Sequence, residues 1–221
     1  FGLLILYHVG MFYVLDWGWH AKSTYQAEWL QLPMVFTNQW RMALLFVISG
    51  LAVSFIWGKY STLQFALRRT WRLLIPLAFG MAVVVTPQPY YEALGKGAIE
   101  PGFLRFWGQY LTFQDFPGEA WFAENMVVWT WNHLWYLPYL LFYTLLLIPI
   151  AKLLEGPAGF LRRGFRSLRG AWIILVPIIP LMIYFNFVFP SYPDIRATFI
   201  DDWYAHAMYG TFFLYGFLIG R

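Results

Sequence analysis

One imidazole, His8, lies in the stretch LLILYHVGMFYVL, which is otherwise uncharged and largely apolar. Polar groups inside a membrane are costly and usually face the interior of a helix bundle or a wet cavity, so each is a candidate functional group. Histidine also titrates near neutral pH, which suits a general base. We therefore take His8 as the candidate catalytic residue. The alternative is that His8 only donates or accepts a hydrogen bond between helices.

The other histidines give weaker signals. His133 lies in the aromatic stretch WNHLWYLPYLLFY, which is equally typical of an aromatic belt leading into a membrane span. His20 and His206 lie close to predicted span ends and could simply be interfacial. A loop acid such as Glu124 or Asp202 could orient one of the histidines, but the sequence does not choose between them.

A second chemical signal is the arginine cluster in LRRTWRLLIP. Arg69 and Arg72 are three residues apart and therefore lie on one face of a helix. Two guanidinium groups placed in this way can hold phosphate groups in a bidentate manner. The alternative is that the cluster anchors the helix at the cytoplasmic face. The second basic stretch, FLRRGFRSLRG, is typical of orientation and contact with anionic lipid.

Composition places these residues in a membrane protein. The 221 residues are 60% hydrophobic and only 12% charged, whereas about 25% charge is typical of a soluble domain. There is no cysteine, so the sequence excludes disulfides and a catalytic thiol. No spacing of histidines and acids indicates a metal site, and we expect no bound cofactor. The net charge of +4 lies in short loops beside helix ends and does not indicate a nucleic-acid partner.

Uncharged segments predict the fold, because a helix that crosses a bilayer needs about 20 apolar residues. The predicted class is all-α, a polytopic transmembrane helical bundle. Pro87 and Pro89 are expected to close the third span. Six spans are predicted, within Phe1–Leu15, Met42–Gly58, Leu73–Val85, Asn125–Ala151, Ala171–Phe189 and Trp203–Gly220. The first is expected to be cut short, so residues 1–221 are interpreted as a single membrane domain truncated at both ends.

Loop charges predict the orientation. The loops on one side of the predicted spans carry ten of the 15 Lys and Arg residues and a single acid, Glu155, while the other side carries five bases and ten acids. Basic loops stay in the cytoplasm. This places Arg69 and Arg72 at the cytoplasmic side. His8 then lies about eight residues before the outer end of its span, roughly 12 Å deep at 1.5 Å per residue.

Four segments, taken in sequence order, resemble the acyltransferase-3 family of integral membrane acyltransferases, and within it the glucan biosynthesis protein C group. They are LYHVGMFY, WRMALLFVISGLAVSF, RRTWRLLIPL and NHLWYLPYLLFY. Trp19 and His20 also resemble the outer loop of that group. The likeness covers nearly the whole sequence and is clearest from Leu3 to Tyr143.

The resemblance implies a bundle of about ten spans, each about 20 residues long, in the bacterial inner membrane. It implies transfer of an acyl group, succinyl or acetyl, from cytoplasmic acyl-CoA to a hydroxyl of an extracytoplasmic glycan such as a periplasmic glucan. In the family, the first-span histidine and the arginine pair are essential, and His8, Arg69 and Arg72 stand in those places. His8 would remove the acceptor proton or transiently carry the acyl group. The weak candidates for lining the acceptor cavity are Arg41, His133, Trp135 and His20.

The competing class is a proton-coupled transporter or flippase of a sugar-containing substrate, with His8 as a proton relay. Such carriers often place acids or histidines at mid-depth and show repeated halves. No acid falls inside a predicted span and no repeat is visible, which disfavours this class. Proton-coupled flux of unmodified substrate would indicate a carrier, and a covalently acylated product would indicate an enzyme.

Overall fold

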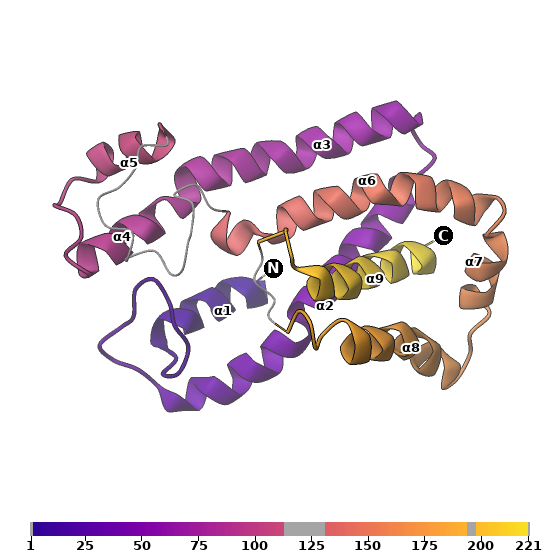
Figure 1. The fold of residues 1–221 in the computed structure, drawn as a ribbon, viewed down its shortest axis with the longest axis horizontal. Helices are drawn as coiled ribbons and strands as arrows, with labels where there is room; N and C mark the ends of the chain where they lie inside the picture. The colour runs from indigo at the N-terminus through magenta and orange to yellow at the C-terminus, as the bar shows by residue number, and fades with distance from the viewer. Residues whose placement is uncertain (1, 113–130, 194–197, 221) are drawn as a thin grey trace. The chain divides into compact units, whose positions relative to one another are not determined.

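The computed structural model describes residues 2–112, 131–193 and 198–220, and these ranges contain helices and no strand. The predicted all-α class is therefore confirmed. Figure 1 shows the helices in chain order. The chain forms two compact units, which are residues 1–40 with 76–134 and residues 41–75 with 135–221. The single-domain organisation stays a prediction.

The helices of the first unit are short, apart from α2, which passes into the second unit. They are α1 (Gly2–Tyr13), a 3-10 turn (Glu28–Leu30), α2 (Gln31–Ile56), a π-helix (Gly80–Val85), α4 (Pro87–Gly95), α5 (Phe103–Leu111) and a 3-10 turn (Asn132–Leu134). The remaining helices lie in the second unit, apart from residues 76–79 at the end of one of them. They are α3 (Thr62–Phe79), α6 (Tyr136–Glu155), α7 (Gly159–Arg166), α8 (Trp172–Phe187) and α9 (Trp203–Gly220).

Three continuous helical stretches in the described residues are long and apolar enough to cross a membrane, namely Glu28–Ile56, Thr62–Gly95 and Asn132–Glu155. They contain the predicted third span, the second as far as Ile56 and the fourth from Asn132; residues 125–130 of the fourth prediction lie outside the described residues. The predicted first and fifth spans are the shorter apolar helices Gly2–Tyr13 and Trp172–Phe187. The predicted sixth span is helical over Trp203–Gly220.

The predicted end of the third span is wrong. Pro87 and Pro89 do not close the helix, because Pro87 is the first residue of α4. Proline is tolerated at this position, since the backbone N–H that it lacks would have no partner within the helix. The six residues before Thr86 form the π-helix instead. The helical path therefore continues to Gly95 and carries Gln88 and Glu92 with it.

Side chains of the same unit stabilise the π-helix. A π-turn disturbs the regular backbone ladder, and such turns are frequent at functional sites. The Met81 carbonyl accepts a hydrogen bond from Tyr110 at 3.2 Å, and the Ala82 carbonyl accepts one from Trp107 Nε1 at 2.7 Å. The Thr86 hydroxyl donates to the Ala82 carbonyl at 2.9 Å. Helix α5 thereby fixes the point from which α4 begins.

The loop after α1 is tied back to that helix. Lys22 Nζ donates to the carbonyls of Met11 at 3.0 Å and Trp17 at 2.9 Å, and also to that of Val14. A cation at this point satisfies carbonyls that the helix end leaves without partners and complements the helix dipole. The Ala27 amide donates to the Tyr13 carbonyl at 2.9 Å. The loop segment that carries Trp19 and His20 is thus held against the end of α1.

The second unit packs around an aromatic core. Phe46 of α2 stacks on Tyr209 of α9 with ring centroids 4.9 Å apart. The helices approach closely because Gly50 and Gly216 have no side chain. A Cβ on Gly50 would lie 1.9 Å from the Phe213 carbonyl oxygen, and one on Gly216 would lie 1.9 Å from that of Val47. Small residues at helix interfaces are typical of membrane bundles.

Candidate functional site

Three of the four histidines gather in the first unit. The His8 ring of α1 lies 5.7 Å from the His133 ring and 6.0 Å from the Trp19 ring, measured between centroids. Trp19 in turn lies 5.6 Å from the His20 ring. All four side chains are half-buried. The structure therefore brings together His8, His20 and His133, which the sequence places in three separate segments.

His8 is nearer the end of its helix than expected. Helix α1 ends at Tyr13 and not at Leu15, so His8 lies about 7.5 Å from its end at 1.5 Å per residue. Its Nδ1 is 2.7 Å from the Leu4 carbonyl oxygen, one turn earlier in the helix. No partner for Nε2 exists among the described residues. One ring nitrogen is therefore anchored and the other is available.

A continuous chain of polar contacts runs beside His8. The Glu92 carboxylate accepts from Lys96 Nζ at 2.6 Å and lies 2.6 Å from His20 Nδ1. His20 Nε2 is 2.6 Å from Asn132 Nδ2, which also donates to Gln88 Oε1 at 2.6 Å. Gln88 Nε2 is 3.2 Å from His133 Nδ1. These contacts link the Glu92 carboxylate to the imidazole of His133, which neighbours His8.

Sequence reasoning missed Gln88, Glu92 and Asn132. Gln88 and Glu92 are four residues apart, so they face the same side of α4, but nothing in the sequence joins that face to His20. Asn132 precedes His133 and has a φ of 40°. Asparagine tolerates this left-handed conformation better than most residues. The acid that contacts His20 is Glu92 of α4, whereas the sequence suggests a loop acid for such a role.

The sequence suggests Glu124 and Asp202 as acids that could orient a histidine. Glu124 lies outside the described residues. Asp202 is buried in the second unit and accepts a hydrogen bond from Tyr139 at 2.5 Å. His206 is in the same cluster. Its Nε2 is 2.8 Å from the Phe199 carbonyl oxygen, and its Nδ1 is 3.2 Å from the Tyr143 hydroxyl.

The arginines of α3 differ in surroundings. Arg68 lies 4.7 Å over the ring of Tyr60, and Arg72 is exposed. Arg69 is half-buried beside Tyr136 of α6, near enough for an electrostatic interaction. Its Nε atom is buried, and among the described residues it has no hydrogen-bond partner. A buried guanidinium donor without a partner is costly, and this makes Arg69 the stronger anion-binding candidate of the three.

The two remaining candidates belong to the second unit. Trp135 packs on Tyr139 at 5.2 Å and on Tyr209 at 5.5 Å between ring centroids, as part of the aromatic core. Arg41 is half-buried and interacts electrostatically with Tyr209. The roles of Arg41 and Trp135 at an acceptor cavity stay predictions.

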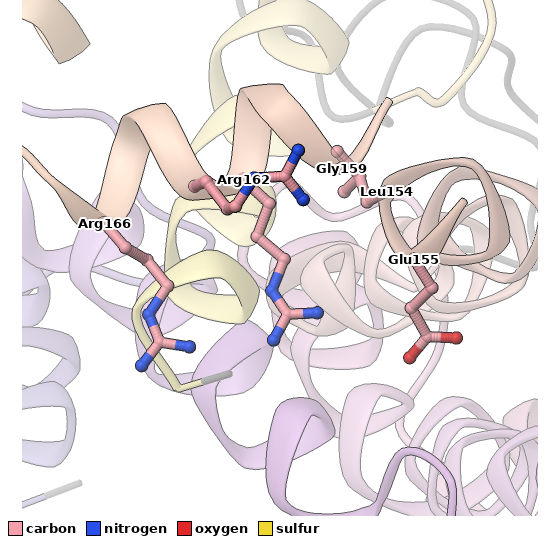
Figure 2. Close-up of a pocket in the computed structure, with 6 residues that line it drawn as sticks. Leu154, Glu155, Gly159, Arg162 and Arg166 are labelled. Carbon is pink, nitrogen blue, oxygen red and sulfur yellow. The ribbon is translucent and has the colours of Figure 1, made fainter. Parts of the chain in front are cut away.

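A basic pocket of about 300 Å³ lies between the end of α6 and α7 (Figure 2). Arg162, Arg163 and Arg166 of α7 line it, with Glu155 of α6 also at its wall. Glu155 accepts a hydrogen bond from Trp57 Nε1 at 2.9 Å, which ties α6 to the end of α2. The predicted contact of this basic stretch with anionic lipid stays a prediction.

Comparison with known proteins decides the family. The acyltransferase-3 family, described as "Acyltransferase domain", matches residues 2–221. The chain belongs to this family. Its relatives include the glucans biosynthesis protein C of Escherichia coli strain K12 and that of Shigella dysenteriae serotype 1 strain Sd197. Each is 28% identical over 134 residues, which cover 59% of this chain and 34% of the relative. The match thus spans about a third of these relatives. No solved structure matches the chain.

Proposed function

We propose that this acyltransferase-family protein transfers a succinyl or acetyl group from cytoplasmic acyl-CoA to a hydroxyl group of an extracytoplasmic glycan, such as a periplasmic glucan, at the bacterial inner membrane. The observation that carries the proposal is the histidine cluster, in which His8 has one anchored and one available ring nitrogen. The similarity to glucans biosynthesis protein C supports a glucan as acceptor.

The contact between His8 Nδ1 and the Leu4 carbonyl supports Nε2 as the basic atom. The Leu4 carbonyl can only accept a hydrogen bond, so Nδ1 carries the proton in neutral His8. The lone pair then resides on Nε2. A neutral imidazole with its orientation fixed through the other ring nitrogen is the arrangement that general-base catalysis requires.

The proposed step balances without a further reactant. His8 Nε2 takes the proton of the acceptor hydroxyl while the hydroxyl oxygen attacks the thioester carbonyl. The carbon–sulfur bond then breaks, and the proton on Nε2 passes to the CoA sulfur as it leaves. The products are an ester and free CoA, and His8 returns to its neutral form. If His8 instead carries the acyl group, Nε2 is the nucleophile.

Arg69 and Arg72 are proposed to bind the phosphate groups of the donor. The buried Arg69 Nε without a described partner supports this assignment, and the exposed Arg72 supplies a second guanidinium on the same helix face. Guanidinium groups bind phosphate oxygens through charge-assisted, often bidentate hydrogen bonds.

The proposal is tested with the full-length protein in a host that lacks its own copy. Mass spectra of periplasmic glucans are compared for wild type, His8→Ala and the double variant Arg69→Gln/Arg72→Gln. We expect a mass increase with wild type that identifies the acyl group and is lost in both variants. Arg162→Gln/Arg163→Gln is the matched control, because it removes two positive charges from α7 and leaves the α3 pair intact.

Three outcomes would overturn parts of the proposal. Unmodified glucans with active wild type in an acyl-CoA hydrolysis assay would exclude the glucan acceptor. A mass increase that survives in His8→Ala would exclude His8 as the base. Equal losses in Arg162→Gln/Arg163→Gln and in Arg69→Gln/Arg72→Gln would exclude a specific role for the α3 pair in binding the donor.

A further inference from the structure

We infer that Glu92, His20, Asn132 and Gln88 form a directional hydrogen-bond relay that holds His133 with its proton on Nε2, so that His133 donates a hydrogen bond at the reaction centre. This inference rests on the proposed function for its chemical meaning, and on the contacts of the first unit for its geometry. It assigns positioning roles to the four relay residues and a second catalytic role to His133.

The direction of the relay follows from its carboxylate end. Glu92 can only accept when ionised, and it accepts from Lys96 as well, so His20 Nδ1 must donate to it. In neutral His20 the other nitrogen, Nε2, then carries no proton and must accept. Its neighbour at 2.6 Å is the Asn132 amide nitrogen, which can only donate. The first half of the chain therefore has a single consistent direction.

The second half follows in the same way. Asn132 Nδ2 has two hydrogens and directs the second one to Gln88 Oε1 at 2.6 Å. The Gln88 amide nitrogen is thereby turned to His133 Nδ1 at 3.2 Å and donates to it. A nitrogen that accepts carries no proton in the neutral ring, so the proton of neutral His133 is on Nε2. The described residues contain no partner for that N–H.

The two neighbouring imidazoles therefore have opposite roles. His8 has its proton on Nδ1 and a lone pair on Nε2, while His133 has a lone pair on Nδ1 and a proton on Nε2. Their rings are 5.7 Å apart, edge to face. A base beside a hydrogen-bond donor suits ester formation, because the base takes the hydroxyl proton and the donor stabilises the negative charge that develops on the thioester oxygen.

The backbone at Asn132 supports the assignment independently. A non-glycine residue at φ 40° is held in an uncommon conformation, and such residues gather at functional sites. The π-helix before α4 is a second irregular element of the same unit. Both irregularities position relay residues, since α4 carries Gln88 and Glu92 and the 3-10 turn carries Asn132.

The tautomer of His133 is measured directly. The full-length protein is labelled with ¹⁵N-histidine, placed in liposomes at pH 8, and studied by solid-state NMR, with the His133 signals assigned from their loss in His133→Gln. We expect a protonated Nε2 and an unprotonated Nδ1 in wild type. In Gln88→Glu, the carboxylate can only accept, and we expect the proton to move to Nδ1.

Measurements of kcat and KM then distinguish a loss of positioning at the reaction centre from a loss of folded protein. We expect Gln88→Glu and His133→Leu to lower kcat by about 10²-fold, the usual loss for one oxyanion donor, with KM changed less than about threefold. His133→Gln is expected to keep most of the wild-type kcat, because the glutamine amide nitrogen can donate a hydrogen bond in place of His133 Nε2.

A protonated Nδ1 in wild type, or an unchanged tautomer in Gln88→Glu, would overturn the relay. The expected tautomers with normal kcat in both Gln88→Glu and His133→Leu would overturn the donor role of His133. If wild type transfers no acyl group at all, the proposed function fails while the NMR result still decides the relay.

Discussion

Two histidine clusters, one in each unit, differ in how their ring nitrogens are occupied. In the first unit, His8 and His133 each have one nitrogen in a hydrogen bond, and the other lacks a partner among the described residues. In the second unit, both nitrogens of His206 are in contact, with the Phe199 carbonyl and the Tyr143 hydroxyl. A base or a donor needs a nitrogen that a substrate can reach, and only the first cluster supplies it.

The surroundings reinforce this difference. His206 stacks on Tyr139 with ring centroids 4.8 Å apart and an interplanar angle of 18°, and Tyr139 also binds Asp202 and the Phe199 amide. His206 borders an apolar pocket of about 470 Å³ formed by α6, α8 and α9. Both of its ring nitrogens nevertheless contact protein groups. A histidine beside a pocket is therefore not sufficient for a catalytic site, since one of its ring nitrogens must also be available to a substrate.

The largest effect is expected at His8. His8→Gln removes the basic Nε2 while keeping a polar side chain, and general-base catalysis contributes about 10²–10⁴-fold to a rate. We expect acyl transfer to fall by that factor with little change in the thermal midpoint. The initial rate of CoA release by purified protein in liposomes measures it. A residual rate above about one tenth of wild type would remove His8 from the chemistry.

The second cluster is expected to respond in stability and not in rate. Tyr139→Phe deletes the hydrogen bonds to Asp202 and Phe199 without changing the shape of the ring. Because one partner is a buried carboxylate, the loss is about 1.5–3 kcal/mol. We expect a lower unfolding midpoint in detergent and an unchanged rate per folded molecule. A rate loss as large as that of His8→Gln would place the chemistry in the second cluster.

Two variants of Asn132 separate the effect of the backbone conformation from that of the side-chain amide. Asn132→Gly keeps the left-handed φ of 40° accessible and removes the relay, so we expect kcat to fall about tenfold, less than for loss of the donor itself. Asn132→Ala also removes the relay and adds backbone strain of about 1–3 kcal/mol. Equal kcat values and a lower midpoint for Asn132→Ala are expected. Wild-type kcat in both variants would show that the amide is not needed.

The smallest effect is expected at Lys22, which holds the loop after α1 to the end of that helix. Lys22→Met keeps the length of the side chain and removes the donors, at a cost of about 1 kcal/mol. We expect a small decrease in the unfolding midpoint and a rate within about twofold of wild type. Limited proteolysis of the loop measures the loosening, and unchanged cleavage would show that Lys22 does not hold it.

The sequence predicts the helices well, because an uncharged run has a single stable form in lipid. It also singles out His8, because a lone imidazole contrasts with its apolar neighbours. The π-helix is different, since Trp107 and Tyr110 of another helix supply the donors that stabilise it. The pairing of His20 with Glu92 joins residues 72 positions apart. Contacts of this kind depend on how segments pack, and no local spacing encodes them.

The most direct test of the account compares how fast each histidine reacts with diethyl pyrocarbonate, which modifies unprotonated ring nitrogens that it can reach. The full-length protein in liposomes is treated at pH 7, and modification of each histidine peptide is followed by mass spectrometry. We predict that His8, whose unprotonated Nε2 has no partner among the described residues, is modified first, that His133, His20 and His206 lag at least about tenfold because their unprotonated nitrogens accept hydrogen bonds, and that activity is lost with the same time course as His8. Modification of His206 as fast as His8, or full activity after His8 is modified, would contradict the account.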